Sequence, residues 1–111
     1  MAPDSFELEI SDTIRRMLSG RGEVSEKRIV GGGLGFMVDG HLCCGISRRG
    51  LTVRVGPDGK ESALQEPHVR PLAFGKREAA AFIVVEPAGL RDGDAVADWV
   101  ERGLRFVATL S

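Results

Sequence analysis

An Asp39-Gly40 dipeptide between two apolar segments is the feature of this chain that most restricts its fold. Both residue types tolerate a positive φ, which a two-residue type I′ turn requires at both central positions, so the pair predicts a tight β-hairpin. The predicted arms are residues 34–38 and 41–47. The register that follows from this turn pairs Val38 with His41, Met37 with Leu42, Phe36 with Cys43, and Gly35 with Cys44.

Because side chains alternate along a strand, this register gives the hairpin two faces, and both are apolar. One predicted face carries Leu34, Phe36, Val38, His41 and Cys43, and the other carries Met37, Leu42, Cys44 and Ile46. If helices cover one face, apolar side chains on the other face still need a partner, and a large apolar patch generally marks an interface. The sequence-based candidates for such an interface are Leu34, Phe36, Met37, Val38, Leu42 and Cys43.

The remaining pattern predicts helices at both ends and further strands between them. A 3.6-residue period predicts helices over residues 4–19, with Asp4 as the N-cap, and 92–109, with Asp92 or Asp94 at the start. A short helix is predicted over about 59–66, strands over 24–30, 51–55 and 80–86, and an irregular basic connection over 67–79. In strand 51–55, Thr52 and Arg54 are expected to face water or a partner. The grouped strands predict an α+β fold of two layers, with an antiparallel sheet of about five strands and helices on one face.

Length and composition indicate one domain, residues 1–111, without a strong global charge. The formal net charge is −1, so no overall field attracts nucleic acid or an anionic membrane. No apolar run approaches the roughly 18 to 20 residues of a membrane span, and the acidic N-terminus does not resemble a secretory signal. We therefore expect a cytoplasmic protein.

Basic residues are concentrated in one part of the chain. From Arg15 to Arg54 there are eight basic and three acidic residues. A solvated basic surface is the simplest interpretation, and a phosphate-binding patch is the alternative. The candidates for nucleic-acid contacts are Lys27, Arg28, Arg48, Arg49 and Arg54. The chain has no tyrosine and few other aromatic residues on which bases could stack, which weakens this hypothesis.

The sequence offers no convincing catalytic, metal or cofactor site. The glycines of residues 31–33 lack the Gly-Lys-Ser/Thr ending of a P-loop and precede a strand rather than a helix, so we interpret them as a bulge or a close strand crossing. Cys43 and Cys44 are expected to point to opposite faces of a strand as reduced, buried thiols. His41, Cys43 and His68 would lack a fourth metal ligand. We expect no catalytic residue and no cofactor.

Several blocks resemble the TfoX N-terminal domain family, in that family's order and spacing. They are residues 26–45, 51–57, 67–74, 82–90 and 99–101, and the resemblance runs from about Val24 to Leu110. The chain departs from the family pattern where Ile29-Val30 is followed by three glycines and where Phe74-Gly75-Lys76-Arg77 replaces a Phe-Thr-Gly-Arg-like block.

The resemblance implies a two-layer α+β fold similar to secretion chaperones, which often dimerise. Members of the TfoX (Sxy) group include bacterial regulators of natural competence that act with the cyclic-AMP receptor protein, and full-length members add a C-terminal helix-hairpin-helix-type domain. The resemblance therefore implies a stand-alone N-terminal domain. It carries over no catalytic or ligand residues.

Three functional hypotheses follow from the sequence. The leading one is a non-enzymatic regulatory module that acts through protein contacts, as a homodimer or with a transcription partner. The alternative is a nucleic-acid-binding transcriptional regulator that uses the basic residues. The third is a thiol- or metal-dependent enzyme, for which the sequence gives the least support.

Overall fold

The computed structural model describes residues 5–29 and 33–110, and over these residues the chain forms three α-helices and a six-stranded antiparallel sheet. The helices are α1 (Ser5–Leu18), α2 (Gly56–Ala63) and α3 (Gly93–Val107), and a 3₁₀ turn η1 spans Pro87–Gly89. The strands are β1 (Val24–Ile29), β2 (Gly33–Val38), β3 (His41–Ser47), β4 (Gly50–Arg54), β5 (Val69–Phe74) and β6 (Arg77–Val85). Their order in the sheet is β1-β2-β3-β4-β6-β5, which leaves β1 and β5 at the edges. The predicted α+β class is confirmed, with six described strands instead of about five.

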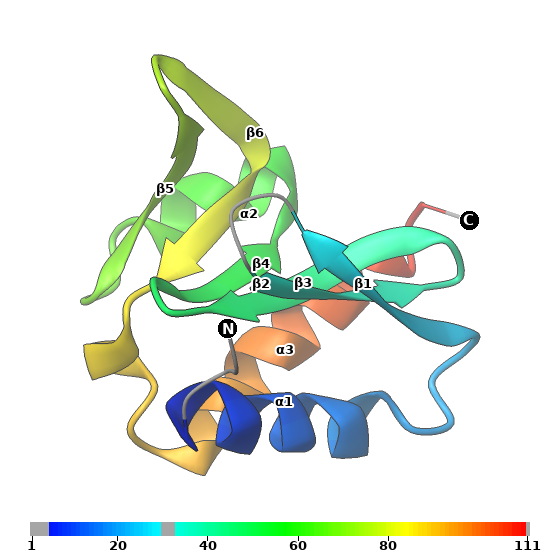
Figure 1. Ribbon diagram of the computed structural model, residues 1–111. Coiled ribbons are helices and arrows are strands. Elements are labelled where there is room, and N and C mark those ends of the chain that lie inside the picture. The colour runs from blue at the N-terminus through cyan, green and yellow to red at the C-terminus, as the bar shows by residue number, and fades with distance from the viewer. Residues whose placement is uncertain (1–4, 30–32, 111) are drawn as a thin grey trace.

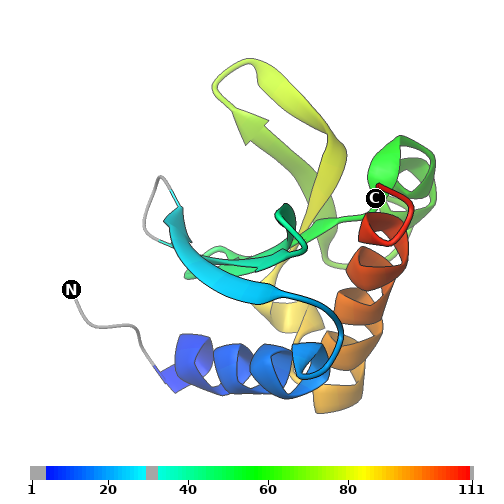
Figure 2. The same ribbon diagram turned by 90° about the vertical axis from the view of Figure 1, so that its right-hand side faces the viewer.

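The molecule has two layers, because α1 and α3 pack on the same side of the sheet (Figures 1 and 2). We call this side the covered face and the opposite side the open face. The β5–β6 hairpin bends away from the rest of the sheet, and α2 packs against β6. Figure 2 shows the three helices to one side of the strands, so the described helices leave the open face uncovered.

The two long helices meet the sheet through apolar stripes with the predicted period. In α1 the buried residues include Ile10, Ile14 and Leu18. The predicted cap Asp4 lies outside the described residues. In α3 the buried set is Val96, Trp99, Val100, Gly103, Leu104 and Val107. Asp92, one of the two residues predicted at the start of this helix, caps α3, since its carboxylate accepts a hydrogen bond from the Asp94 backbone N–H at 2.9 Å.

The β2–β3 hairpin turns at Asp39-Gly40 as predicted, and both residues have a positive φ, of 50° and 84°. The first two predicted pairs are confirmed, Val38 with His41 and Met37 with Leu42. The remaining predicted pairs are wrong, because a register shift places Phe36 opposite Cys44, Gly35 opposite Gly45 and Leu34 opposite Ile46. The shift is a β-bulge in which β3 contributes one extra residue.

This bulge changes which side chains reach each face. Because directly paired residues share a face, Cys44 and Ile46 join Phe36 and Leu34 on the covered face, and both are buried. The register expected from the sequence places Cys44 and Ile46 on the opposite face, and this expectation is wrong. The open face of this hairpin is therefore less apolar than predicted, since glycines occupy the positions next to Leu42.

Two other predictions need correction. Residues 67–79 are not an irregular connection, because β5, a turn at Gly75 (φ 63°) and the start of β6 occupy most of them. Pro71 lies within β5, where it is tolerated because β5 is an edge strand. The short helix begins at Gly56 instead of residue 59, with Pro57 in its first turn, where the missing N–H costs no hydrogen bond.

Candidate functional site

The open face contains a groove with a volume of about 750 Å³. It lies between β1 and the β2–β3 hairpin on one side and the bent β5–β6 hairpin on the other. A groove of this size is in the usual range for binding sites. The lining residues are Ile29, Gly33, Leu42, Ser47, Arg48, Arg49, Thr52, Arg70, Leu72, Ala73, Phe74 and Val84.

Glycines form the part of the open face that lies beneath the Ile29 side chain. A Cβ added at Gly33 would lie 2.9 Å from Ile29 Cδ1, and one added at Gly35 would lie 3.0 Å from Ile29 Cγ2. At Gly45 the added atom would lie 3.2 Å from the Leu34 carbonyl oxygen. Gly33, Gly35 and Gly45 therefore permit the close approach of a side chain from the edge strand. Of the residues 31–33 interpreted as a bulge or a close strand crossing, 31 and 32 lie outside the described residues.

The apolar part of the groove comes from four strands. Ile29, Leu42 and Leu72 are half-buried, and Val84 is buried, with 4% of its surface exposed. Phe74, at the end of β5, is 64% exposed. A large aromatic side chain at the edge of an apolar groove adds to the surface that a partner could cover.

The basic part of the groove lies at the β3–β4 turn. Arg48 and Arg49 form this turn. Arg70 of β5 lies at the same end of the sheet, because it pairs with Val84 of β6, which in turn pairs with Thr52 of β4. All three arginines are exposed. Arg70 Nε lies 3.6 Å from a carboxylate oxygen of Glu86.

The structure separates the other predicted basic candidates from this cluster. Arg28 pairs with Leu34 and so faces the α1 side, whereas Lys27 alternates with it toward the open face of edge strand β1. Arg54 lies at the far end of β4 and stacks on Phe82 and Phe106, with 5.4 and 5.9 Å from its guanidinium carbon to the ring centroids. Its Nε is buried without a hydrogen-bond partner among the described residues. Arg54 is thus a packing residue.

The interaction candidates are divided between the two faces. Phe36, Val38 and Cys43 are buried under the helices, with 0%, 3% and 0% of their surfaces exposed. Leu34 is partly buried and packs against the same core. Only Met37 and Leu42 alternate toward the open face, and only Leu42 lines the groove. Sequence reasoning missed Arg70, Leu72, Phe74 and Val84.

The adjacent cysteines both lie in the core, so the expectation that they point to opposite faces is wrong. The bulge turns both side chains toward the helices, and both residues are completely buried. A hydrogen bond from the Cys44 thiol to the Cys43 sulfur, together with burial, raises the pKa of Cys44 well above its ordinary value. Cys44 in turn lowers the pKa of Cys43 by donating a hydrogen bond to its sulfur. Complete burial keeps both sulfurs away from any substrate.

No group of three metal-ligating side chains exists among the described residues. His41 pairs with Val38 beside the hairpin turn, as predicted, and His68 lies in the connection before β5. Across the part of the chain that the structure describes, no helix has the length and apolar character to cross a membrane.

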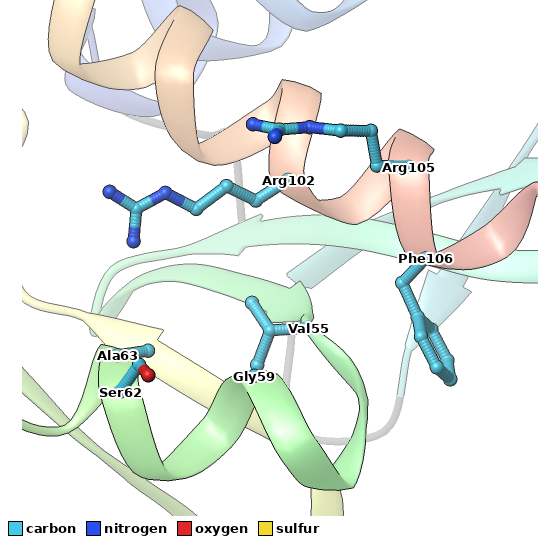
Figure 3. Close-up of a pocket in the computed structure, with 7 residues that line it drawn as sticks. All are labelled: Val55, Gly59, Ser62, Ala63, Arg102, Arg105 and Phe106. Atoms are coloured by element: carbon cyan, nitrogen blue, oxygen red, sulfur yellow. The ribbon is translucent and has the colours of Figure 1, made fainter.

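A second, smaller hollow of about 390 Å³ lies between α2 and α3 (Figure 3). Arg102 and Arg105 of α3 line it together with Val55, Gly59 and Ser62, and in Figure 3 the Arg105 side chain runs alongside α3. The Arg102 guanidinium is already paired with Glu66 and with Asp98, and it lies 4.0 Å from the Trp99 ring centroid. The contacts with Asp98 and Trp99 lie within α3, and the contact with Glu66 links α3 to the segment that follows α2. The Arg102 guanidinium at this hollow therefore has a structural role.

The TfoX N-terminal domain profile matches residues 16–107, which is most of the chain and includes every residue that lines the groove. The TfoX N-terminal domain family is not a known enzyme family. No curated protein and no solved structure matches this chain.

Proposed function

Because this chain belongs to the TfoX N-terminal domain family, we propose that it is a non-enzymatic regulatory module that acts in the cytoplasm through protein contacts made by its open face. The role would correspond to the regulation of transcription in competence, with the partner being a second copy or a transcription protein. The single observation that carries this proposal is the apolar groove on a sheet face that the described helices leave uncovered.

The two faces of the sheet support an interaction role rather than a catalytic one. The covered face contains the only two cysteines, and it buries them beyond the reach of a substrate. The open face instead combines aliphatic side chains with exposed arginines. Such a combination is typical of a protein interface, where apolar contacts supply most of the affinity and charges at the edge favour one partner over another.

Site-specific photo-crosslinking in the native host tests this proposal. Leu72, in the groove, is replaced by p-benzoylphenylalanine, and Glu61, exposed on α2, is replaced in a matched control. We expect a discrete crosslinked protein from position 72 only. The purified partner should then bind the wild-type chain and lose affinity for Leu72→Glu. Equal crosslinking from both positions, or unchanged binding to Leu72→Glu, would contradict the proposal.

Light scattering distinguishes self-association from a separate partner. If the partner is a second copy, the wild-type chain should be dimeric at high micromolar concentration and Leu72→Glu monomeric. A strict monomer at that concentration rules out the homodimer and leaves the transcription protein as the partner.

Nucleic-acid binding is a second candidate, favoured by the grouping of Arg48, Arg49 and Arg70 at one end of the groove. Such binding would weaken steeply as salt increases, because phosphate contacts release counterions. Fluorescence anisotropy with labelled DNA over a salt series measures this slope. An absence of binding at low salt rules this candidate out.

A further inference from the structure

We infer that the segment bound in the groove is acidic and aliphatic, with aliphatic side chains over Leu42, Leu72 and Val84 and carboxylates at the arginine end. This inference rests on the proposed function, and it adds the chemistry by which the partner is recognised.

The charge of the groove has one sign. Among the described residues that line it, Arg48, Arg49 and Arg70 are basic and none is acidic. A carboxylate oxygen of the neighbouring Glu86 lies 3.6 Å from Arg70 Nε, and no ion pair of Arg48 or Arg49 occurs among the described residues. Since the chain as a whole has a net charge of −1, this local excess is a property of the groove and not of the composition. Carboxylates are complementary to such a site because guanidinium groups bind them in a bidentate geometry.

Apolar side chains lie beside the arginine end of the groove and continue beyond it. Along β5, Arg70 is followed by the half-buried Leu72 and then by Phe74. Val84 of β6 is paired directly with Arg70, and Leu42 of β3 lines the groove from the β2–β3 hairpin. A ligand that is complementary throughout must therefore have an anionic end and an aliphatic body.

The exposed Phe74 favours a chain segment over a small anion. This residue is 64% exposed although it lines the groove. A small molecule inside the groove would leave much of this ring in water, whereas a segment that enters over β5 would cover it. The same surface disfavours single-stranded nucleic acid, because Phe74 is the only aromatic residue among the described lining residues and bases usually stack on several.

Selection from a phage-displayed library of random twelve-residue peptides tests this inference without a known partner. The library is selected on the wild-type chain after depletion on Arg48→Glu/Arg49→Glu. We expect the enriched peptides to combine Asp or Glu with Leu, Ile or Val. Their synthetic versions should bind the charge-reversed variant about tenfold more weakly than wild type, the loss expected when two exposed charge pairs become repulsive.

Two controls separate the groove from general electrostatics. Arg16→Glu/Arg91→Glu changes the net charge equally, but both arginines are exposed and neither lines the groove, so affinity should be unchanged. Leu72→Ser should weaken binding while leaving all the arginines in place. Unfolding curves confirm that each variant folds.

Three results would overturn the inference: enrichment of basic peptides or of none, equal affinity for wild type and Arg48→Glu/Arg49→Glu, or tighter binding of a twenty-nucleotide DNA strand than of any selected peptide. If crosslinking from position 72 still identifies a protein partner, the proposed function stands and only the chemistry of its segment is wrong. If neither experiment finds a partner, both proposals fall.

Discussion

The two faces of the same sheet differ in what their side chains contact. On the covered face Phe36, Cys44 and Ile46 are buried under α1 and α3, with at most 1% of their surfaces exposed. On the open face the corresponding positions of the hairpin are Gly35, Leu42 and Gly45, and the surface is concave. The covered face therefore stabilises the fold, whereas the described helices leave the open face uncovered.

This comparison implies that stability and binding can be changed separately. Substitutions on the covered face should lower the free energy of unfolding. Substitutions in the groove should alter binding while leaving the free energy of unfolding nearly unchanged. A matched pair of substitutions, one on each face, tests this directly.

The largest expected effect is that of Phe36→Ala. The ring is completely buried, and the Arg15 guanidinium lies 5.9 Å from its centroid. Removing it should lower the free energy of unfolding by about 3–5 kcal/mol through lost burial and the cavity left behind. Urea denaturation followed by Trp99 fluorescence measures this change.

Phe74→Ala is the matched control, since it removes the same ring from the open face. Because Phe74 is 64% exposed, the free energy of unfolding should change by no more than about 0.5 kcal/mol. A loss at position 74 comparable to that at position 36 would mean that the open face also stabilises the fold, and the distinction between the faces would be wrong.

The next effect concerns the contact between α3 and the sheet. A Cβ at Gly103 would lie 3.0 Å from the Cys43 carbonyl oxygen and 3.1 Å from its sulfur. Overpacking of this kind costs about 1–3 kcal/mol, and the better helix propensity of alanine offsets about 1 kcal/mol. We expect Gly103→Ala to lower the free energy of unfolding by about 1 kcal/mol.

Gly93→Ala provides the control on the same helix. Nothing lies within 4 Å of an added Cβ there, so this variant should be neutral or slightly more stable in the same urea titration. If both alanines had the same effect, helix propensity and not the contact with Cys43 would decide the outcome at Gly103.

The sequence predicts more of the covered face than of the open face. The helix stripes and the turn at Asp39-Gly40 depend on local periodicity and on the φ preferences of two residues, and both were predicted correctly. The bulge could not be predicted, because apolar residues lie on both sides of the hairpin and a shift by one residue leaves no charge buried. Its reason is tertiary: Gly35 opposite Gly45 makes room for Ile29.

Only some of the residues that line the groove were predicted, because the groove also depends on tertiary structure. Arg48, Arg49 and Leu42 were among the candidates, whereas Arg70, Leu72 and Phe74 lie in the segment interpreted as irregular. Gly75-Lys76 between two short runs is a hairpin signal that would have found β5. The grouping of these residues in one groove still depends on the strand order, in which β6 lies between β4 and β5.

The smallest expected effect concerns the ion pair that links helix α1 to the edge strand β1. Arg15 of α1 donates two hydrogen bonds to Glu26 of β1, at 2.7 and 2.9 Å. The side chains are 43% and 35% exposed, so solvent screening limits the contribution of the pair to about 0.5 kcal/mol. Glu26→Gln should lower the free energy of unfolding by no more than this amount at pH 7.

The effect of Glu26→Gln should also depend on pH in a defined direction. Hydrogen bonding from Arg15 lowers the pKa of Glu26 below its ordinary value of 4.5. The stabilisation is therefore fully present above that ordinary value and is lost as the pH falls through the lower pKa of the folded state. Urea titrations at pH 7 and at about pH 3 should show the difference in unfolding free energy between wild type and variant shrinking toward zero on acidification. At pH 7, 1 M salt should also reduce this difference.

Glu61→Gln, an exposed control on α2, should show no such trend. A difference between wild type and Glu26→Gln that grew on acidification would mean that Arg15 does not hold β1 through the ionised carboxylate.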